Sequence, residues 1–205
     1  RPDAAAWLQG ILRQDDVLVL VSAITPDKGK DVATFMRNLA MGQHVSAALE
    51  QPVCSHVVYI SSDAVYDDAA PLIRETSGCS PSTFHGLMHL GGERILAQAG
   101  QRSRIPLLVV RPCAIYGAGD THQGYGPNRF LRTALTERAI KLFGQGEEQR
   151  DHLYIHDLSR LVGLCLLHGS EGILNAASGS SVSFGELARL VAELCGEPVR
   201  IEPTM

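Results

Sequence analysis

Three short apolar runs, each followed by small or polar residues, constrain the fold of this chain most strongly. They span 17–21, 57–60 and 107–110 and consist of valine, leucine and isoleucine with a single tyrosine. Such runs, which lack an alternation of polar residues, are typical of parallel strands buried on both faces. Helical patterns over 31–50 and 84–99 separate the runs. The alternation predicts an α/β fold with a doubly wound parallel sheet.

The second half of the chain consists of shorter segments after a glycine-containing loop at 117–127. We expect helices at 128–138, 157–168 and 183–195, and short strands at 141–143, 151–155, 172–175 and 199–201. The pattern predicts a Rossmann-like core over residues 1–115. Residues 116–205 are expected to form mostly a smaller substrate-binding lobe, with some segments returning to the core.

The charge balance excludes several classes of partner. The 205 residues include 18 basic and 22 acidic side chains, for a formal charge of -4, so no basic field is present to attract nucleic acid or an anionic membrane. The longest apolar run, 17–24, is far too short to cross a bilayer. Five scattered cysteines form no CxxC pair, which favours reduced thiols and a cytoplasmic protein.

Polar and glycine-containing motifs recur where the predicted strands end, which is where ligands bind in open α/β sheets. In chain order they are VSA (21–23), NLAMG (38–42), VVYISSDAVY (57–66), RPCAIYG (111–117), GQGEEQRDHLYIHD (144–157) and GILNAASGSSVSFGELARLV (172–191). By these motifs, in this order, the chain resembles the NAD-dependent epimerase/dehydratase family of extended short-chain dehydrogenases/reductases. The resemblance implies NAD or NADP as cofactor, a nucleotide-sugar-like substrate and a homodimer.

The sequence departs from the family pattern at its beginning. The glycine-rich loop that seats the dinucleotide pyrophosphate at a helix N-terminus is not found. In the family this loop belongs to the first strand and helix, which would precede Arg1. We therefore expect the sequence to be a fragment that lacks the opening βαβ units.

A second departure lies in the expected active site. The family motif Tyr-x-x-x-Lys is followed four residues later by Glu, and alignment on Glu93 places His85 at the tyrosine and His89 at the lysine. The spacing of four puts both imidazoles on one helical face. The only lysines are Lys28, Lys30 and Lys141, so none from this region replaces the family lysine.

Two interpretations of this pair remain open. In the first, His85 transfers the proton in place of tyrosine, because imidazole titrates near neutral pH; His89 bonds the cofactor ribose and Ser62 orients the substrate oxygen. In the second, the chemistry is lost and only ligand binding remains. A zinc site made by both histidines with Glu93 is a third possibility, but the family register explains the spacing without a metal, and we expect none.

The resemblance also implies binding residues. The expected cofactor contacts are Ser22, Ala23, Asn38, Ser61, His89, Arg111 and Pro112. The expected substrate contacts are Asp63, Asn128, Arg129 and Arg150, the two arginines because guanidinium groups bind phosphate oxygens bidentately. Asp63 and Asn128 have the alternative role of capping helices. Ala64 stands where related dehydratases have glutamate, which favours epimerisation or reduction over dehydration.

Overall fold

The three apolar runs form adjacent strands of one parallel sheet. β1 (Val17–Leu20) pairs with β2 (His56–Ile60), β2 pairs with β3 (Leu107–Pro112), and β3 pairs with β7 (Gly172–Ala176), all in parallel. This arrangement confirms the predicted α/β, Rossmann-like architecture. The computed structural model describes residues 3–51, 53–70, 72–120 and 124–204.

The chain divides into two compact units. The first comprises Arg1–Pro112 and Leu161–Ala176, and therefore contains the parallel sheet; the second comprises Cys113–Arg160 and Ala177–Met205. The first unit thus ends three residues before the boundary expected at 115, and one later segment returns to it.

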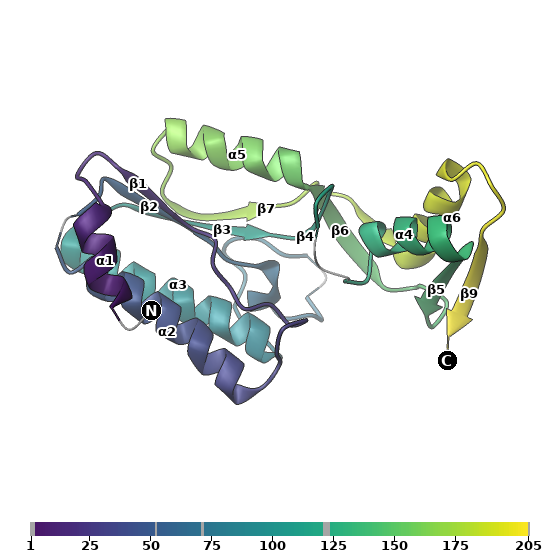
Figure 1. The fold of residues 1–205 in the computed structure, drawn as a ribbon, viewed down its shortest axis with the longest axis horizontal. Coiled ribbons are helices and arrows are strands. Elements are labelled where there is room, and N and C mark those ends of the chain that lie inside the picture. Colours follow the sequence, from purple (N-terminus) through teal and green to yellow (C-terminus); the bar gives the residue numbers. More distant parts are fainter. Residues whose placement is uncertain (1–2, 52, 71, 121–123, 205) are drawn as a thin grey trace. The chain divides into compact units, whose positions relative to one another are not determined.

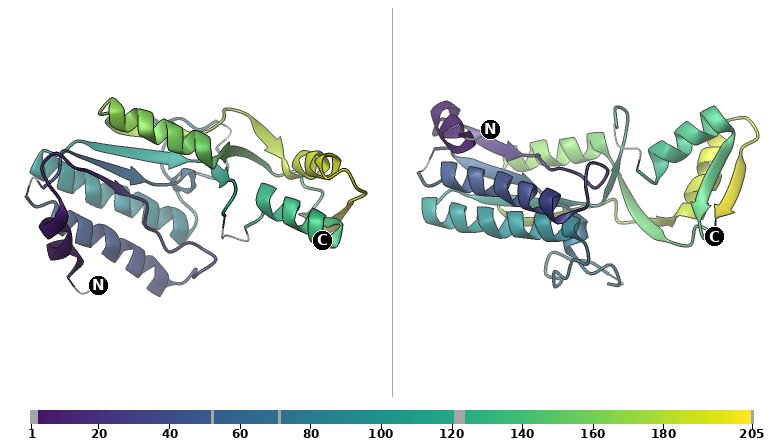
Figure 2. Two further views of the ribbon diagram at one scale, coloured as in Figure 1. Left: turned by 45° about the horizontal axis from the view of Figure 1, so that its top comes forward. Right: turned by 60° about the horizontal axis from the view of Figure 1, so that its bottom comes forward.

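Helices flank the sheet of the first unit. α1 (Ala4–Ile11), α2 (Val32–Ala48) and α3 (Phe84–Ser103) lie on one face, with α2 beside α3, and the end of α5 (Ile155–Leu167) runs over the other face (Figures 1 and 2). A short 3-10 helix, η1 (Asp63–Val65), follows β2. α2 and α3 begin at side-chain caps: Asp31 accepts the N–H of Thr34, and the hydroxyl of Thr83 accepts the N–H of Gly86.

The core of the first unit lies between the sheet and α1 to α3. Its buried residues are Val45, Leu49, Cys54, Val57, Tyr59, Leu96, Ala99, Ile105 and Val109. Within the sheet, Val58 lies opposite both Val19 and Leu108. α3 packs closely on β2 because residue 92 is glycine: a Cβ atom there would lie 2.7 Å from the Tyr59 hydroxyl.

The prediction that the first apolar run is buried on both faces was wrong. Leu18 and Leu20 pack against the core, but Val17 and Val19 are 40% and 36% exposed. Among the described residues, β1 is the outermost strand and pairs only with β2. Helices α1 to α3 cover one face of β1, so the side chains on its other face, Val17 and Val19, remain exposed.

The second unit contains two small sheets. β6 (Gln149–Tyr154) is central to one, pairing in parallel with β4 (Ala114–Tyr116) and antiparallel with β8 (Ser181–Ser183). β5 (Ala139–Phe143) and β9 (Arg200–Thr204) form the other, in parallel.

Two helices complete this unit. α4 (Pro127–Glu137) and α6 (Phe184–Leu194) pack together over a core that contains Phe130, Ile140 and Phe184. α6 begins with a reciprocal capping box between Ser183 and Glu186, which satisfies two backbone N–H groups at the helix start. Among the described residues, no helix has the length and apolar character needed to cross a membrane.

Candidate functional site

A buried ionic network lies at the carboxyl ends of β2 and β3. Arg111 donates two hydrogen bonds to Glu93 of α3, at 2.9 and 2.6 Å, and Ser61 donates a third to the same carboxylate at 2.6 Å. Arg111 is only 2% exposed and Glu93 5%. Removal of one partner of such a buried ion pair strongly destabilises the folded protein, because the other charge is left without compensation.

The network continues to β7 through a tyrosine. Arg111 donates to the Tyr66 hydroxyl at 2.7 Å, and that hydroxyl donates to the Asn175 side chain at 2.8 Å. Burial alone lowers the pKa of Arg111, but the bonds to Glu93 and Tyr66 outweigh it and hold the pKa above its ordinary value. Ser61 and Arg111 therefore join α3, η1 and the sheet, with their side-chain bonds directed inside the protein.

Ser62 and Asp63 lie one step further along the chain. The Ser62 hydroxyl accepts the Ala64 N–H at 3.1 Å, so it caps η1, and it donates to the Asp63 carboxylate at 3.2 Å. Both residues are half-buried. A hydroxyl oxygen has two lone pairs, so Ser62 keeps one of them to accept a hydrogen bond from a substrate hydroxyl.

His85 and His89 lie on one face of α3, as their spacing predicts. Their rings meet edge to face with centroids 4.7 Å apart. Gly86 allows this end of α3 to approach η1, because a Cβ atom at position 86 would lie 2.1 Å from the Ala64 carbonyl oxygen. The close packing holds the first turn of α3, which contains His85, against η1, which Ser62 caps.

The two histidines differ in environment. His89 is 5% exposed and its Nδ1 lies 3.2 Å from the Tyr59 hydroxyl. Burial, with a smaller contribution from the nearby His85, lowers the pKa of His89 to about 3. His89 is therefore uncharged at neutral pH and supplies no positive charge. His85 is half-buried and reaches a cavity.

That cavity, of about 540 Å³, lies between the N-terminal turns of α2 and α3 and the loop after β1. It is lined by Ile24, Pro26, Gly29, Lys30, Asp31, Thr34, Phe35, Asn38, Ser82, Thr83, Phe84, His85 and Met88. We call it the His85 cavity. Phe35 and Phe84 stack on one of its walls with ring centroids 5.3 Å apart. The sequence analysis did not assign Lys30, Phe35 or Phe84 to the site. Lys30 is the last lysine before a long stretch without lysine (31–140), and this position could have drawn attention to it.

The expected cofactor residues separate into buried and accessible groups. Asn38 is 8% exposed, and its side chain bonds both the N–H and the carbonyl of Ile24 at 2.7 and 3.0 Å. Asn38 thus holds the loop after β1 in place. Ser22 is exposed and Ala23 half-buried, whereas Pro112 is buried. The Thr25 hydroxyl in the same loop is buried with no hydrogen-bond partner among the described residues.

The remaining predicted residues belong to the second unit. The Asn128 side chain donates to the Gly117 carbonyl and to Asp120, at 3.0 and 2.8 Å, and does not cap α4, whose cap position is Gly126. Arg129 is exposed. Arg150 pairs with Glu148 at 2.7 Å on the surface, a geometry that contributes little to stability.

Asp151, next to Arg150, organises this unit in a way that the sequence analysis missed. Its carboxylate accepts the N–H groups of Ser178 and Gly179 at 3.0 and 2.7 Å and a weak bond from Cys113 at 3.4 Å. Burial raises the pKa of Asp151, but these bonds outweigh it and lower the pKa overall. The Arg-Asp motif thus contains one exposed cation and one anchoring carboxylate.

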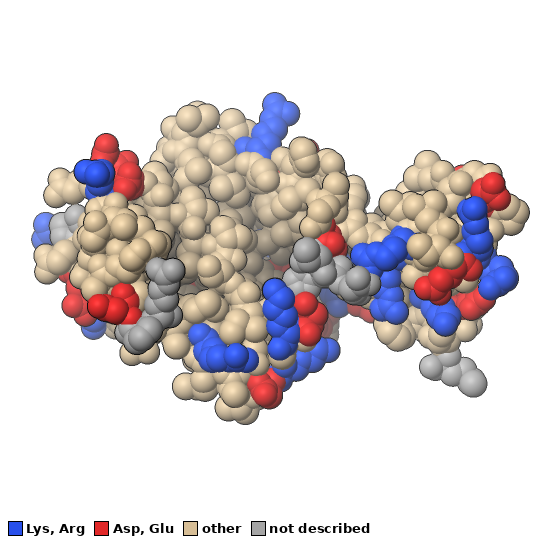
Figure 3. Space-filling model, viewed as in Figure 1, with Lys and Arg blue, Asp and Glu red and all other residues tan. Residues whose placement is uncertain are grey.

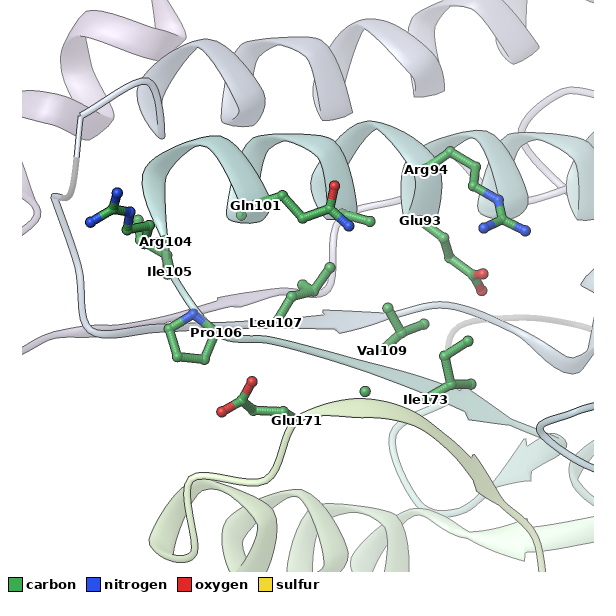
Figure 4. Close-up of a pocket in the computed structure, with 13 residues that line it drawn as sticks. Glu93, Arg94, Gln101, Arg104, Ile105, Pro106, Leu107, Val109, Glu171 and Ile173 are labelled. Carbon is green, nitrogen blue, oxygen red and sulfur yellow. The ribbon is translucent and has the colours of Figure 1, made fainter.

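A second cavity in the first unit, of about 440 Å³, lies between α3 and the strands β3 and β7 (Figure 4). Arg94 and Gln101 line it from α3, Leu107 from β3 and Ile173 from β7. None of the predicted catalytic side chains borders it. Among the described residues, no group of three His, Cys, Asp or Glu side chains could hold a metal ion. On the face shown in Figure 3, acidic and basic residues are interspersed.

Comparisons with known proteins place these features in a family. The model of the NAD dependent epimerase/dehydratase family matches residues 3–177. A Bacillus subtilis protein described as an uncharacterised UDP-glucose epimerase is 24% identical over 191 residues, which cover 91% of this chain and 57% of that protein. A Streptomyces bikiniensis dTDP-4-dehydro-6-deoxy-D-allose reductase is 35% identical over 101 residues, 46% of this chain and 30% of the reductase. The chain thus spans little more than half of the first relative's length and less than a third of the second's.

Solved structures share the fold. The UDP-N-acetylglucosamine 4-epimerase of Bacillus cereus superposes with a TM-score of 0.87 at 22% identity, covering 98% of this chain and 69% of the epimerase. The UDP-N-acetylglucosamine 4-epimerase of Methanobrevibacter ruminantium M1 superposes with a TM-score of 0.86 at 19% identity, covering 96% of this chain and 66% of that one. With the family model matched over most of its length, the chain belongs to the NAD dependent epimerase/dehydratase family.

Proposed function

We propose that this chain is the catalytic part of an NAD-dependent enzyme that epimerises or reduces a nucleotide sugar, with His85 as the proton-transferring residue. The observation that carries this proposal is the placement of His85. It is the imidazole that reaches a cavity, it stands near the β2 end where Ser62 lies, and its neighbour His89 is buried and uncharged. A half-buried imidazole can accept and return a proton near neutral pH.

The residues after β1 fit a bound dinucleotide. Ser22 and Ala23 leave backbone accessible at this strand end, and the buried Thr25 hydroxyl has an unused hydrogen-bonding capacity among the described residues. Ligands of open α/β sheets bind at such ends. We favour NAD because the family is described as NAD dependent and because related structures, such as the UDP-glucuronic acid 4-epimerase of Bacillus cereus, contain NAD. When bound, this cofactor exchanges a hydride with the substrate carbon.

The side chains of this chain perform the proton chemistry. Ser62 orients the reacting sugar oxygen, while His85 removes the proton from that hydroxyl and returns it in the reverse step. The His89 ring contacts the His85 ring edge to face and holds it in place. Because His89 is neutral, it adds no positive charge to the site. The role of His89 therefore differs from that of a lysine, which carries a charge. Asp63, beside Ser62, would contact the sugar.

The second unit supplies candidate groups for the nucleotide. Arg129 and Arg150 are exposed, and guanidinium groups bind diphosphate oxygens bidentately. Arg150 would exchange its surface pair with Glu148 for the ligand. Asn128 would act indirectly, through its hydrogen bonds to Gly117 and Asp120 of the preceding loop. We accordingly assign dinucleotide binding to the first unit and substrate binding mainly to the second.

A homodimer and a cytoplasmic location complete the proposal. α2 and α3 expose large apolar side chains, with Met36 56% and Leu87 40% accessible. Paired surfaces of that kind favour association of two copies. The free cysteine thiols are in keeping with a reducing compartment.

A second candidate function, ligand binding without catalysis, is favoured by one observation. His89 is buried and neutral, so the position lacks the positive charge that a lysine would provide. In such a protein the His85 cavity would bind a nucleotide sugar and leave it unchanged. Sugar conversion, not binding, separates the two candidates.

The test uses the full-length gene product. Binding of NAD+ and NADP+ is measured by calorimetry. The protein with bound oxidised cofactor is then incubated with UDP-glucose and UDP-N-acetylglucosamine, and, with NADH or NADPH supplied as the hydride donor, with dTDP-4-dehydro-6-deoxyglucose, while proton NMR follows the anomeric signals. We expect micromolar NAD+ binding and conversion of at least one sugar. Binding of the sugars without conversion would favour the second candidate, and a folded protein that binds neither cofactor nor sugar would contradict both.

A further inference from the structure

The His85 cavity contains a cation that the proposed proton chemistry does not use. Lys30 lines the cavity from the loop after β1, and His85 and Phe84 line it from α3. No ion pair is formed by Lys30 among residues 3–51, 53–70, 72–120 and 124–204. Since His89 is uncharged, Lys30 is the permanent positive charge on the described wall of this cavity.

The placement of Lys30 is fixed by its neighbours. Gly29 packs on the start of α2 so closely that a Cβ atom would lie 2.3 Å from the Thr34 hydroxyl oxygen and 3.2 Å from the Thr34 Cβ. On the other side of Lys30, the Asp31 carboxylate accepts the Thr34 N–H at 2.8 Å as the helix cap. Residues 29 to 31 are therefore held against the same turn of α2, where Lys30 lines the cavity.

The acidic neighbour of Lys30, which also lines the cavity, is engaged by the start of α2. The Asp31 carboxylate is engaged by the helix N-terminus, and its hydrogen bonds to Thr34 lower its pKa. Its charge is thus offset locally by backbone N–H groups. The Lys30 ammonium keeps three donors for a ligand.

From this arrangement we infer that Lys30 is the anion-binding residue of the His85 cavity, so that the substrate carries a negatively charged group that reaches Lys30 while its reacting hydroxyl meets His85. The inference rests on the proposed function and adds an anion-binding residue to its site. The stacked Phe35 and Phe84 rings supply an apolar wall between the two polar groups. In a nucleotide sugar, the anion is either a carboxylate on the sugar or the diphosphate, and both bind an ammonium by the same charge-assisted hydrogen bonds.

Three variants of the full-length protein test the inference. Lys30→Met removes the charge and retains the stem, Lys30→Arg retains the charge, and Lys28→Met removes a neighbouring exposed charge of the same loop that does not line the cavity. Calorimetry measures the binding of UDP-glucose, dTDP-glucose, UDP-glucuronate and NAD+ to each variant and to the unaltered protein. Urea unfolding checks that stability is unchanged.

We expect Lys30→Met to weaken nucleotide-sugar binding by roughly 10- to 100-fold, the usual effect of a lost bond to a charged group. Lys30→Arg should recover most of the loss, and Lys28→Met should bind as the unaltered protein does. A loss confined to UDP-glucuronate assigns the anion to the sugar carboxylate, and an equal loss for all three sugars assigns it to the diphosphate.

Other results would overturn the inference. If the unaltered protein binds the sugars and Lys30→Met binds them equally well, Lys30 is not the anion site although the proposed function stands. The same conclusion follows if Lys28→Met has the effect of Lys30→Met, or if only NAD+ binding is lost. If the unaltered protein binds none of the sugars, the proposed function and this inference fall together.

Discussion

Two groups of polar residues at the carboxyl end of the parallel sheet are built in opposite ways. Ser61, Glu93 and Arg111 form a closed network whose hydrogen-bonding groups face one another. Ser62, His85 and Lys30 are half-buried or exposed, and the last two border a cavity. Ser61 and Ser62 are adjacent in the sequence and yet belong to different groups.

The position of a residue in a family motif therefore does not by itself determine its chemical role. In the closed group, each residue stabilises the packing of α3 on the sheet, and its removal should affect folding more than binding. In the open group, the side chains retain capacity for a ligand, and their removal should affect binding or turnover more than folding. Arg111→Met and His85→Ala, described below, test this division directly.

The largest expected effect on stability comes from Arg111→Met. It leaves the Glu93 carboxylate buried without its ionic partner, which typically lowers the free energy of unfolding by about 3–5 kcal/mol. Urea unfolding measures the change. Arg94→Met, which removes the exposed arginine next to Glu93, is the control and should alter stability by less than about 0.5 kcal/mol. Equal effects of the two variants would break the division.

A smaller effect is expected from the protonation of His89. In the folded protein its pKa is about 3, whereas the unfolded chain takes up the proton near pH 6.5, so the contribution to stability is complete above about pH 6.5 and is lost as the pH falls toward 3. Urea unfolding at pH 7 and pH 5 should show a loss of about 2 kcal/mol beyond that of His89→Gln. An identical pH dependence of the two proteins would mean that His89 is not held neutral.

The smallest effect concerns the start of α3. Thr83→Ala removes the cap that accepts the Gly86 N–H and should lower the free energy of unfolding by about 1 kcal/mol. Because His85 lies in the first turn, turnover should fall along with stability. Thr136→Ala, in the last turn of α4, is the control and should change neither quantity measurably. A turnover unaffected by Thr83→Ala would show that His85 does not depend on the helix start.

Much of the fold was predictable because it follows from the spacing of apolar residues along the sequence. The apolar runs and the helices between them fall where the pattern places them, within a few residues of the observed ends. α1 was missed because it has only 8 residues, fewer than the window of about 11–18 over which a helical period can be recognised. β4 and β8 have only 3 residues each, too few to show a period. The exposure of Val17 depends on the position of β1 in the sheet, which a local run does not encode.

The site was predictable only in part. A spacing of four residues places His85 beside His89, because a helix brings such residues together. The pairing of Arg111 with Glu93 joins two elements, and Tyr66 meets Asn175 across a separation of 109 residues. No local pattern distinguishes such partners from ligand-binding residues. The sequence therefore named candidate positions but not which of their side chains face inward.

The most direct test of the account is the turnover of His85→Ala in the full-length protein, measured on whichever nucleotide sugar the unaltered protein converts, with NAD+ binding and urea unfolding followed in parallel. We predict that turnover falls by roughly 10²- to 10⁴-fold, the usual contribution of a general acid–base residue, while NAD+ affinity and stability stay close to those of the unaltered protein. Unchanged turnover would contradict the assignment of proton transfer to His85, and a loss of stability like that of Arg111→Met would place His85 in the closed group.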